Sequence, residues 1–141
     1  MPPNYHETTL SRKRRDELDA MGEALRALCW EEGAPCHWSP SIYVLSRDAA
    51  LRFAQMHHAR LLGAGAARMV FGVAEGAIKI HIGSRPFEDN QNEILLWRSA
   101  PPEVAQHLVP ILASAKDSSW VLMPEVEVGG KLSDAVATIL K

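Results

Sequence analysis

Two short apolar runs separated by a glycine-containing turn constrain the fold of this chain most. Residues 68–73 (Arg-Met-Val-Phe-Gly-Val) and residues 77–82 (Ala-Ile-Lys-Ile-His-Ile) are largely apolar, and residues 74–76 (Ala-Glu-Gly) separate them. This pattern predicts an antiparallel β-hairpin. Lys79 interrupts the second run. Because a buried face excludes an ammonium group unless it has a partner or a role, Lys79 marks a candidate functional position.

Two glycines before the hairpin and a glutamate after it lie at distinctive positions. The sequence reads Gly63-x-Gly65-x-x-Arg68, then the hairpin with Lys79, and then Glu93 in a predicted helix. This order resembles the glycine-rich loop, the β3 lysine and the helix glutamate of the protein kinase-like fold. The resemblance implies an ion pair between Lys79 and Glu93, which in kinases holds the phosphates of a nucleotide. The resemblance thus implies a vestigial nucleotide-binding site formed by Gly63, Gly65, Arg68, Lys79 and Glu93. No cofactor is expected, and ATP is the ligand to test.

The resemblance is confined to the small lobe. Residues 120–125 (Trp-Val-Leu-Met-Pro-Glu) resemble the family's fifth strand and the hinge that follows it. Arg68 replaces the third glycine of the family loop, and the sequence contains neither a His-Arg-Asp catalytic loop nor an Asp-Phe-Gly triplet. The similarity therefore covers residues 61 to roughly 130 and implies a pseudokinase-like fragment with no catalytic residues. A stand-alone lobe of this kind resembles kinase-like proteins of bacterial viruses and prophages.

Composition and charge argue against several classes of protein. The chain has 141 residues, of which 47% are hydrophobic and 23% charged, so it can form one folded domain with a core. A formal net charge of −2 and a pI near 6.3 argue against nucleic acid as a partner. No apolar run reaches the ~18 to 20 residues of a membrane span, and the first residues lack the regions of a signal peptide. We therefore expect a cytoplasmic protein without a membrane partner.

Residues 1–60 predict an N-terminal arm followed by two helices. Apolar residues from Leu18 to Cys29 recur at helical spacing, so one helix is expected from about residue 11 to 31. Ser46 predicts the N-cap of a second helix that runs to about Arg60. The two helices would extend the small lobe and either pack on its sheet or replace contacts that a large lobe would supply.

Residues 61–141 predict the sheet and its helix, and the whole chain predicts one compact domain. A helix is expected over residues 87–97, and the runs 108–113 and 120–123 predict a second hairpin. Residues 132–140 carry an apolar stripe that predicts a short closing helix. The predicted fold class is α+β: an antiparallel sheet of about five strands with one central helix after the third strand, two N-terminal helices and a short C-terminal helix.

Other candidate residues favour structural roles. Cys29 and Cys36 are the only cysteines, and a zinc site at Cys36-His37 lacks a second pair of ligands, so free structural thiols are expected. The basic run at residues 12–15 is followed at once by acidic residues, which favours a solvated first turn over a phosphate-binding patch. His57 and His58 point about 100° apart on a helix, so His57 is expected to be a hydrogen-bonded residue at the core edge.

Two functions from different classes remain open. In the first, the chain is a non-catalytic protein-binding module on a truncated kinase-like fold, such as a phage or prophage regulator or inhibitor of a host or defence protein. It would contact a protein partner, or a second copy in a homodimer, through the face that a large lobe would cover. In the second, it is a nucleotide-binding subunit that another chain completes into an active phosphotransferase. Arg68 bears on the choice, because its bulk obstructs phosphates whereas its charge attracts them.

Overall fold

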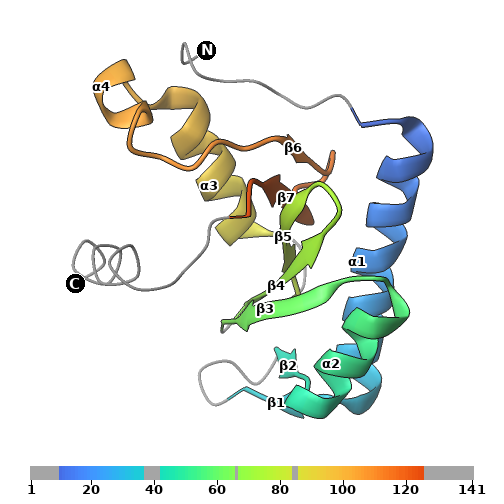
Figure 1. Cartoon of the computed structure of the whole chain (residues 1–141). Coiled ribbons are helices and arrows are strands. Elements are labelled where there is room, and N and C mark those ends of the chain that lie inside the picture. Colours follow the sequence, from blue (N-terminus) through green and yellow to red (C-terminus); the bar gives the residue numbers. More distant parts are fainter. Residues whose placement is uncertain (1–9, 37–41, 66, 84–85, 126–141) are drawn as a thin grey trace, which may run out of the picture.

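The computed structural model describes residues 10–36, 42–65, 67–83 and 86–125 (Figure 1). Within them four helices form: α1 (Arg12–Glu32), α2 (Arg47–Met56), α3 (Glu88–Ser99) and α4 (Pro102–Ala105). Seven strands form as well: β1 (Ala34–Pro35), β2 (Tyr43–Val44), β3 (Arg60–Ala64), β4 (Arg68–Val73), β5 (Gly76–His81), β6 (Ala113–Ser114) and β7 (Trp120–Met123). The predicted N-terminal arm and closing helix lie outside the described residues. None of the described helices combines the length and the apolarity needed to cross a bilayer.

Five strands form one antiparallel sheet in the spatial order β3-β4-β5-β7-β6, and β1 and β2 form a separate two-stranded sheet. The predicted hairpin consists of β4 and β5, in which Val70 lies opposite Lys79. Along the chain, α3 follows the third strand of the large sheet. The predicted α+β class, the five-stranded antiparallel sheet and the helix after its third strand are therefore confirmed.

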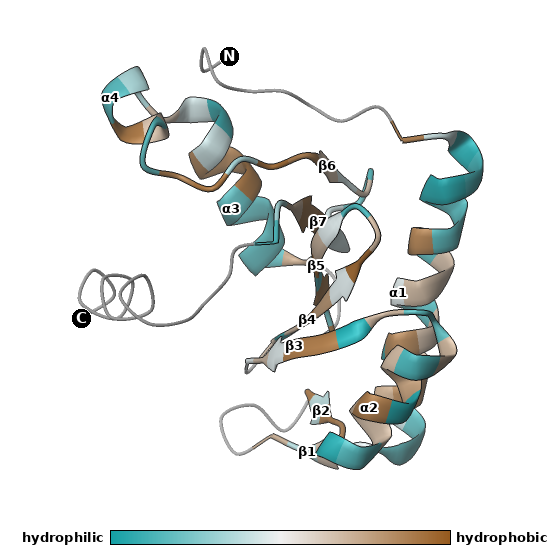
Figure 2. Ribbon diagram, in the orientation of Figure 1, coloured by the Kyte–Doolittle hydropathy of each residue, from teal (hydrophilic) through white to brown (hydrophobic). Residues whose placement is uncertain are grey.

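Helices cover both faces of the large sheet. Because alternate residues of a strand point to opposite faces, Ile78 and Ile80 join one core with α1 and α2, whereas Val121 and Met123 join a second core with α3 and α4. Figure 1 shows α1 along one side of the sheet and α3 with α4 on the other. Hydrophilic and hydrophobic residues alternate along α1 in Figure 2, as expected for a helix with one buried face. The N-terminal helices thus pack on the sheet, which is the first of the two expected arrangements.

Polar contacts attach the start of α1 to the sheet. The Ser11 hydroxyl accepts a hydrogen bond from the Arg14 backbone N–H and caps the helix. The Arg14 side chain donates to both carboxylate oxygens of Glu75, at 2.6 and 2.8 Å, in the turn between β4 and β5. Arg15 donates to the carbonyl oxygen of Ser114 in β6 at 3.0 Å. The predicted solvated first turn is therefore wrong for these two arginines, because the folded sheet supplies acceptors for both.

The chain after α2 departs most from the sequence prediction. Ser46 caps α2 as predicted, but the helix ends at Met56 rather than near Arg60. His58 has a φ of 53°, a left-handed conformation that does not continue a right-handed helix. The chain then enters β3, whose backbone pairs with β4. Gly63 therefore lies within a strand and not at the end of a helix.

The segment before β6 is less regular than the predicted strand over residues 108–113. β6 comprises only Ala113–Ser114. Pro110 has no backbone N–H to donate to a strand ladder and lies in the irregular part. Leu108 and Ile111 instead pack into the core beneath α3 and α4. This irregular segment contributes to the wall of the cleft described next.

Candidate functional site

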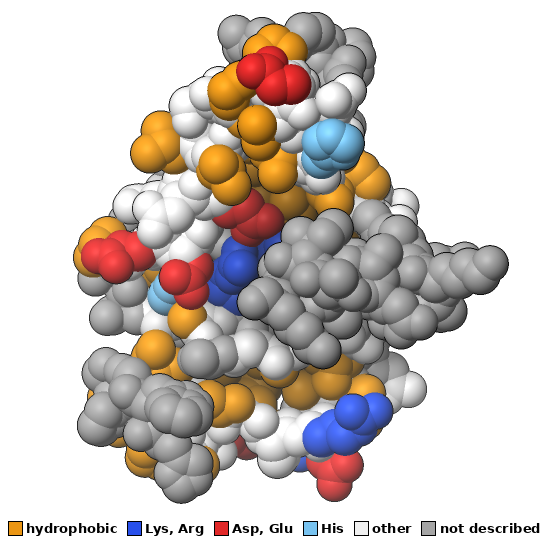
Figure 3. All heavy atoms as spheres, turned by 90° about the vertical axis from the view of Figure 1, so that its left-hand side faces the viewer, with side chains coloured by type: hydrophobic (Ala, Val, Ile, Leu, Met, Phe, Trp, Pro, Cys, Tyr) orange, Lys and Arg blue, Asp and Glu red, His pale blue; other side chains and the backbone are white. Residues whose placement is uncertain are grey.

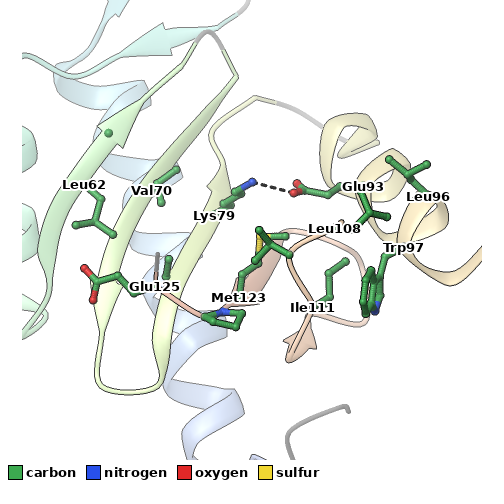
Figure 4. A pocket seen from close by; sticks show the side chains of 14 residues that line it. Leu62, Val70, Lys79, Glu93, Leu96, Trp97, Leu108, Ile111, Met123 and Glu125 are labelled. Carbon is green, nitrogen blue, oxygen red and sulfur yellow. Dashed lines mark hydrogen bonds and ion pairs between the residues drawn. The ribbon is translucent and has the colours of Figure 1, made fainter. Parts of the chain in front are cut away.

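A cleft of about 490 Å³ lies on the α3 side of the large sheet. The strands β3, β4 and β5 form one wall, α3 and residues 108–111 form the other, and residues 123–125 complete the lining. Figure 4 shows Leu62 and Val70 on the sheet side, and Leu96, Leu108 and Trp97 on the opposite side. Most of these residues are apolar, so the cleft suits apolar groups of a ligand.

Three charged side chains meet beside this cleft. Lys79 Nζ donates to Glu93 Oε1 at 2.8 Å, and the Arg68 guanidinium donates to Glu93 Oε2. Arg68 also donates to Asn90 Oδ1 at 3.3 Å, and the buried Asn90 amide donates to the Ser118 carbonyl oxygen at 2.9 Å. These bonds hold α3 against β4 and β5. The predicted ion pair between Lys79 and Glu93 is confirmed.

The cluster of Arg68, Lys79 and Glu93 carries two positive charges and one negative charge. Its side chains are only 22–28% exposed. Burial alone raises the pKa of the Glu93 carboxyl group, but the hydrogen bonds and charges of Lys79 and Arg68 together outweigh burial and hold that pKa below its usual value. Glu93 is therefore ionised at neutral pH. The cluster by itself keeps one positive charge, and Glu125, the other carboxylate that lines the cleft, forms a salt bridge with Arg60. The cluster can therefore attract an anionic group at the cleft.

The five residues of the predicted nucleotide site do not all line the cleft. Gly63, Lys79 and Glu93 line it, whereas Gly65 and Arg68 are not among its lining residues. The Gly65 backbone N–H donates to the Arg68 carbonyl oxygen at 2.8 Å, which closes the connection from β3 to β4. Arg68 is the first residue of β4, and its guanidinium contacts Glu93. Nucleotide binding by these residues stays a prediction.

Sequence reasoning missed the aliphatic rim of the cleft. Leu62, Leu96 and Val109 line the cleft and are 42%, 53% and 41% exposed. On this face of the molecule, Figure 3 shows acidic and basic side chains together at the centre, with a group of hydrophobic side chains above them. Burial alternates along β3, with Leu61 partly buried and Leu62 exposed, but these two adjacent leucines cannot be told apart in the sequence.

The remaining candidates have structural surroundings. Cys29 and Cys36 are both free, and burial raises the pKa of the Cys29 thiol to about 11. The ring of His57 packs on Phe53 with 4.4 Å between ring centroids, at the core edge as expected, but among the described residues its ring forms no hydrogen bond of the kind that was predicted. Burial is the main cause that lowers its pKa. No three His, Cys, Asp or Glu side chains gather as metal ligands within the described ranges. The histidine after Cys36 lies outside those ranges.

The geometry offers a ligand aliphatic walls, an exposed aliphatic rim and, beside the cleft, a cluster that carries one unbalanced positive charge. These features favour binding of an apolar group that carries an anion. Comparison with protein-family models, with curated protein sequences and with solved structures found no match to this chain.

Proposed function

We propose that this chain is a non-catalytic binding domain, built like a kinase small lobe, that holds a segment of another protein in its cleft. The observation that carries the proposal is the aliphatic rim of Leu62, Leu96 and Val109, which is about half exposed around a largely apolar cleft. Contiguous exposed apolar surface is typical of interaction sites. A regulator or inhibitor of another protein, which the resemblance to phage and prophage proteins implies, would act through such a surface.

The arrangement of the sheet supports the kinase-like part of the proposal. Lys79 in a central strand pairs with Glu93 on the helix that follows, as the resemblance implies. Met123, Pro124 and Glu125, the residues that resemble the end of the fifth strand and the hinge, line the cleft. α1 and α2 cover the opposite face of the sheet. In the proposed kinase-like arrangement, the face that carries the cleft would meet the large lobe.

The charge of the cleft defines the chemistry of the partner. Lys79 and Arg68 share the single carboxylate of Glu93, so a bound segment should carry aliphatic side chains and one acidic group. Buried aliphatic surface contributes about 25 cal/mol per Å², whereas a solvent-exposed ion pair contributes about 1 kcal/mol or less. The aliphatic side chains would provide most of the affinity, and the acidic group would fix the orientation of the segment.

Matched charge substitutions test this proposal. Leu96→Asp places a carboxylate on the rim, and Leu51→Asp places one on a leucine of α2 that is 42% exposed on the other side of the sheet. A candidate partner is first captured from the cell that produces this chain, then purified and titrated by calorimetry. The purified partner is expected to bind the wild type and Leu51→Asp equally, and Leu96→Asp about tenfold more weakly, a loss of about 1.4 kcal/mol. Equal affinity for all three proteins would contradict the proposal.

A nucleotide-binding subunit is the second candidate, and one observation favours it. Gly63, Lys79 and Glu93 line the same cleft. ATP is titrated into the pure chain by calorimetry with and without Mg²⁺, and phosphate release is measured in the same samples. Binding at micromolar ATP that Lys79→Gln weakens would favour this candidate. The first proposal instead predicts no heat of binding at that concentration and no ATP turnover.

A further inference from the structure

The cleft begins where the described chain ends. Pro124 and Glu125 line it, and residues 126–141 follow in the sequence. We propose that residues 131–140 bind in the cleft of the same molecule and thereby compete with a partner. The competition with a partner rests on the proposed function, whereas the contact between residues 131–140 and the cleft does not.

The sequence of this segment matches the chemistry of the cleft. Leu132, Val136 and Ile139 are spaced so that one face of a helix would be aliphatic, with Leu140 extending it. A helix of this length is marginal in water by itself and gains its stability from an apolar surface. Asp134 is the acidic residue of the segment and can pair with the positively charged cluster, whereas Lys131 lies at the start of the segment, next to the tether. The segment therefore carries both features expected of a bound ligand.

The tether is short enough to keep the segment at the cleft. Residues 126–130 (Val-Glu-Val-Gly-Gly) separate it from Glu125, and five extended residues reach at most about 17 Å. A linker of this length gives an effective concentration in the millimolar range. Even a contact that would be too weak to form between separate molecules is then populated within one molecule.

The cleft is large enough for several aliphatic side chains. Its volume of about 490 Å³ lies within the range of roughly 300–1,000 Å³ that is typical of ligand-binding clefts. The rim leucines Leu62 and Leu96 stand on opposite walls, as Figure 4 shows. A helix between these walls would cover both, together with Val109, and remove aliphatic surface from water. A partner that binds the same rim would first have to displace the segment.

Disulfide formation in the pure, full chain tests the contact. The native thiol of Cys36 is removed by Cys36→Ser, and the buried thiol of Cys29, with a pKa of about 11, stays protonated and unreactive. Leu96→Cys is then combined with Val136→Cys on the predicted apolar face. The control combines Leu96→Cys with Thr138→Cys, which points about 200° away from position 136 on a helix. We expect the first pair to form an intramolecular disulfide about tenfold faster than the control.

Three other results would overturn the inference. Equal rates for the two pairs would mean that the tail meets the cleft only by random collision. A disulfide-linked dimer as the main product would assign the cleft to a second copy of the chain. The experiment is repeated with Leu62→Cys, on the opposite wall, in place of Leu96→Cys, in case the substitution at position 96 impairs folding. Equal rates for the pairs 62/136 and 62/138 would likewise mean random collision. Because no partner is present, these outcomes are independent of whether the proposed protein partner exists.

Discussion

Replacing Glu93 by glutamine tests how much the charged cluster contributes to stability. In the folded protein this carboxylate accepts a hydrogen bond from Lys79 at 2.8 Å and a second one from Arg68. Hydrogen bonds to charged groups contribute about 1.5–3 kcal/mol each, but side chains that are 22–28% exposed regain part of this from water. Glutamine keeps the size and one acceptor but leaves two cations without a counter-charge. We expect Glu93→Gln to lower the free energy of unfolding by about 2 kcal/mol at pH 7.

The pH dependence of this loss follows from the pKa of Glu93. Because Lys79 and Arg68 hold that pKa below its usual value in the folded protein, the carboxylate contributes its full stability above the unfolded pKa of about 4.3. The contribution disappears as the pH falls through the lower, folded pKa. The stability difference between the wild type and Glu93→Gln should therefore be constant from pH 8 to about pH 5 and shrink below about pH 4.3.

Urea unfolding followed by tryptophan fluorescence measures the effect. With a slope near 2 kcal/mol per M, a loss of 2 kcal/mol shifts the midpoint by about 1 M urea. Glu31→Gln is the control, because Glu31 is an exposed carboxylate of α1 that forms no salt bridge with any described residue. It should change the stability by less than ~0.5 kcal/mol. If the midpoint of Glu93→Gln coincides with that of the control at pH 7, the cluster contributes nothing measurable and the reasoning is refuted.

Two further predictions concern a glycine and the cysteines. Gly76→Ala is expected to lower the free energy of unfolding by about 3 kcal/mol in the same urea assay, because Gly76 has a φ of 151° and an added Cβ would lie 2.2 Å from the Met123 carbonyl oxygen. Gly63→Ala, whose Cβ meets no neighbouring atom within 4 Å, should change the free energy of unfolding by less than ~1 kcal/mol. Equal losses of stability in the two variants would argue against a close approach of the Met123 carbonyl oxygen to Gly76. Iodoacetamide at pH 8 should alkylate Cys36 in the folded protein and Cys29 only in urea, because burial protects Cys29 and raises its pKa to about 11. Mass spectrometry that finds both thiols modified at equal rates in the folded protein would contradict this.

The sequence by itself determined the elements whose signals are local. The apolar stripe from Leu18 to Cys29 predicts α1, and Ser46 predicts the start of α2, because helical spacing and N-caps depend only on neighbouring residues. The hairpin of β4 and β5 is equally local, since a short turn sets its register. The partner of Lys79 was also predictable. A lysine in an apolar strand needs an acidic neighbour, and the resemblance to the kinase-like fold implied Glu93 among the acidic residues of the next helix.

Only the tertiary structure decided what depends on residues far apart in the chain. Arg60–Ala64 forms a strand because the edge of β4 is there to supply hydrogen bonds, and pairing of this kind overrides a helical pattern that continues from α2. The indole N–H of Trp120 in β7 donates to Asp19 in α1 at 2.7 Å, a contact that no spacing rule predicts. The cleft likewise exists only where β3, α3 and the end of β7 come together. Its aliphatic rim could not be read from the sequence, because an exposed leucine and a buried one look alike until the packing of distant segments sets their exposure.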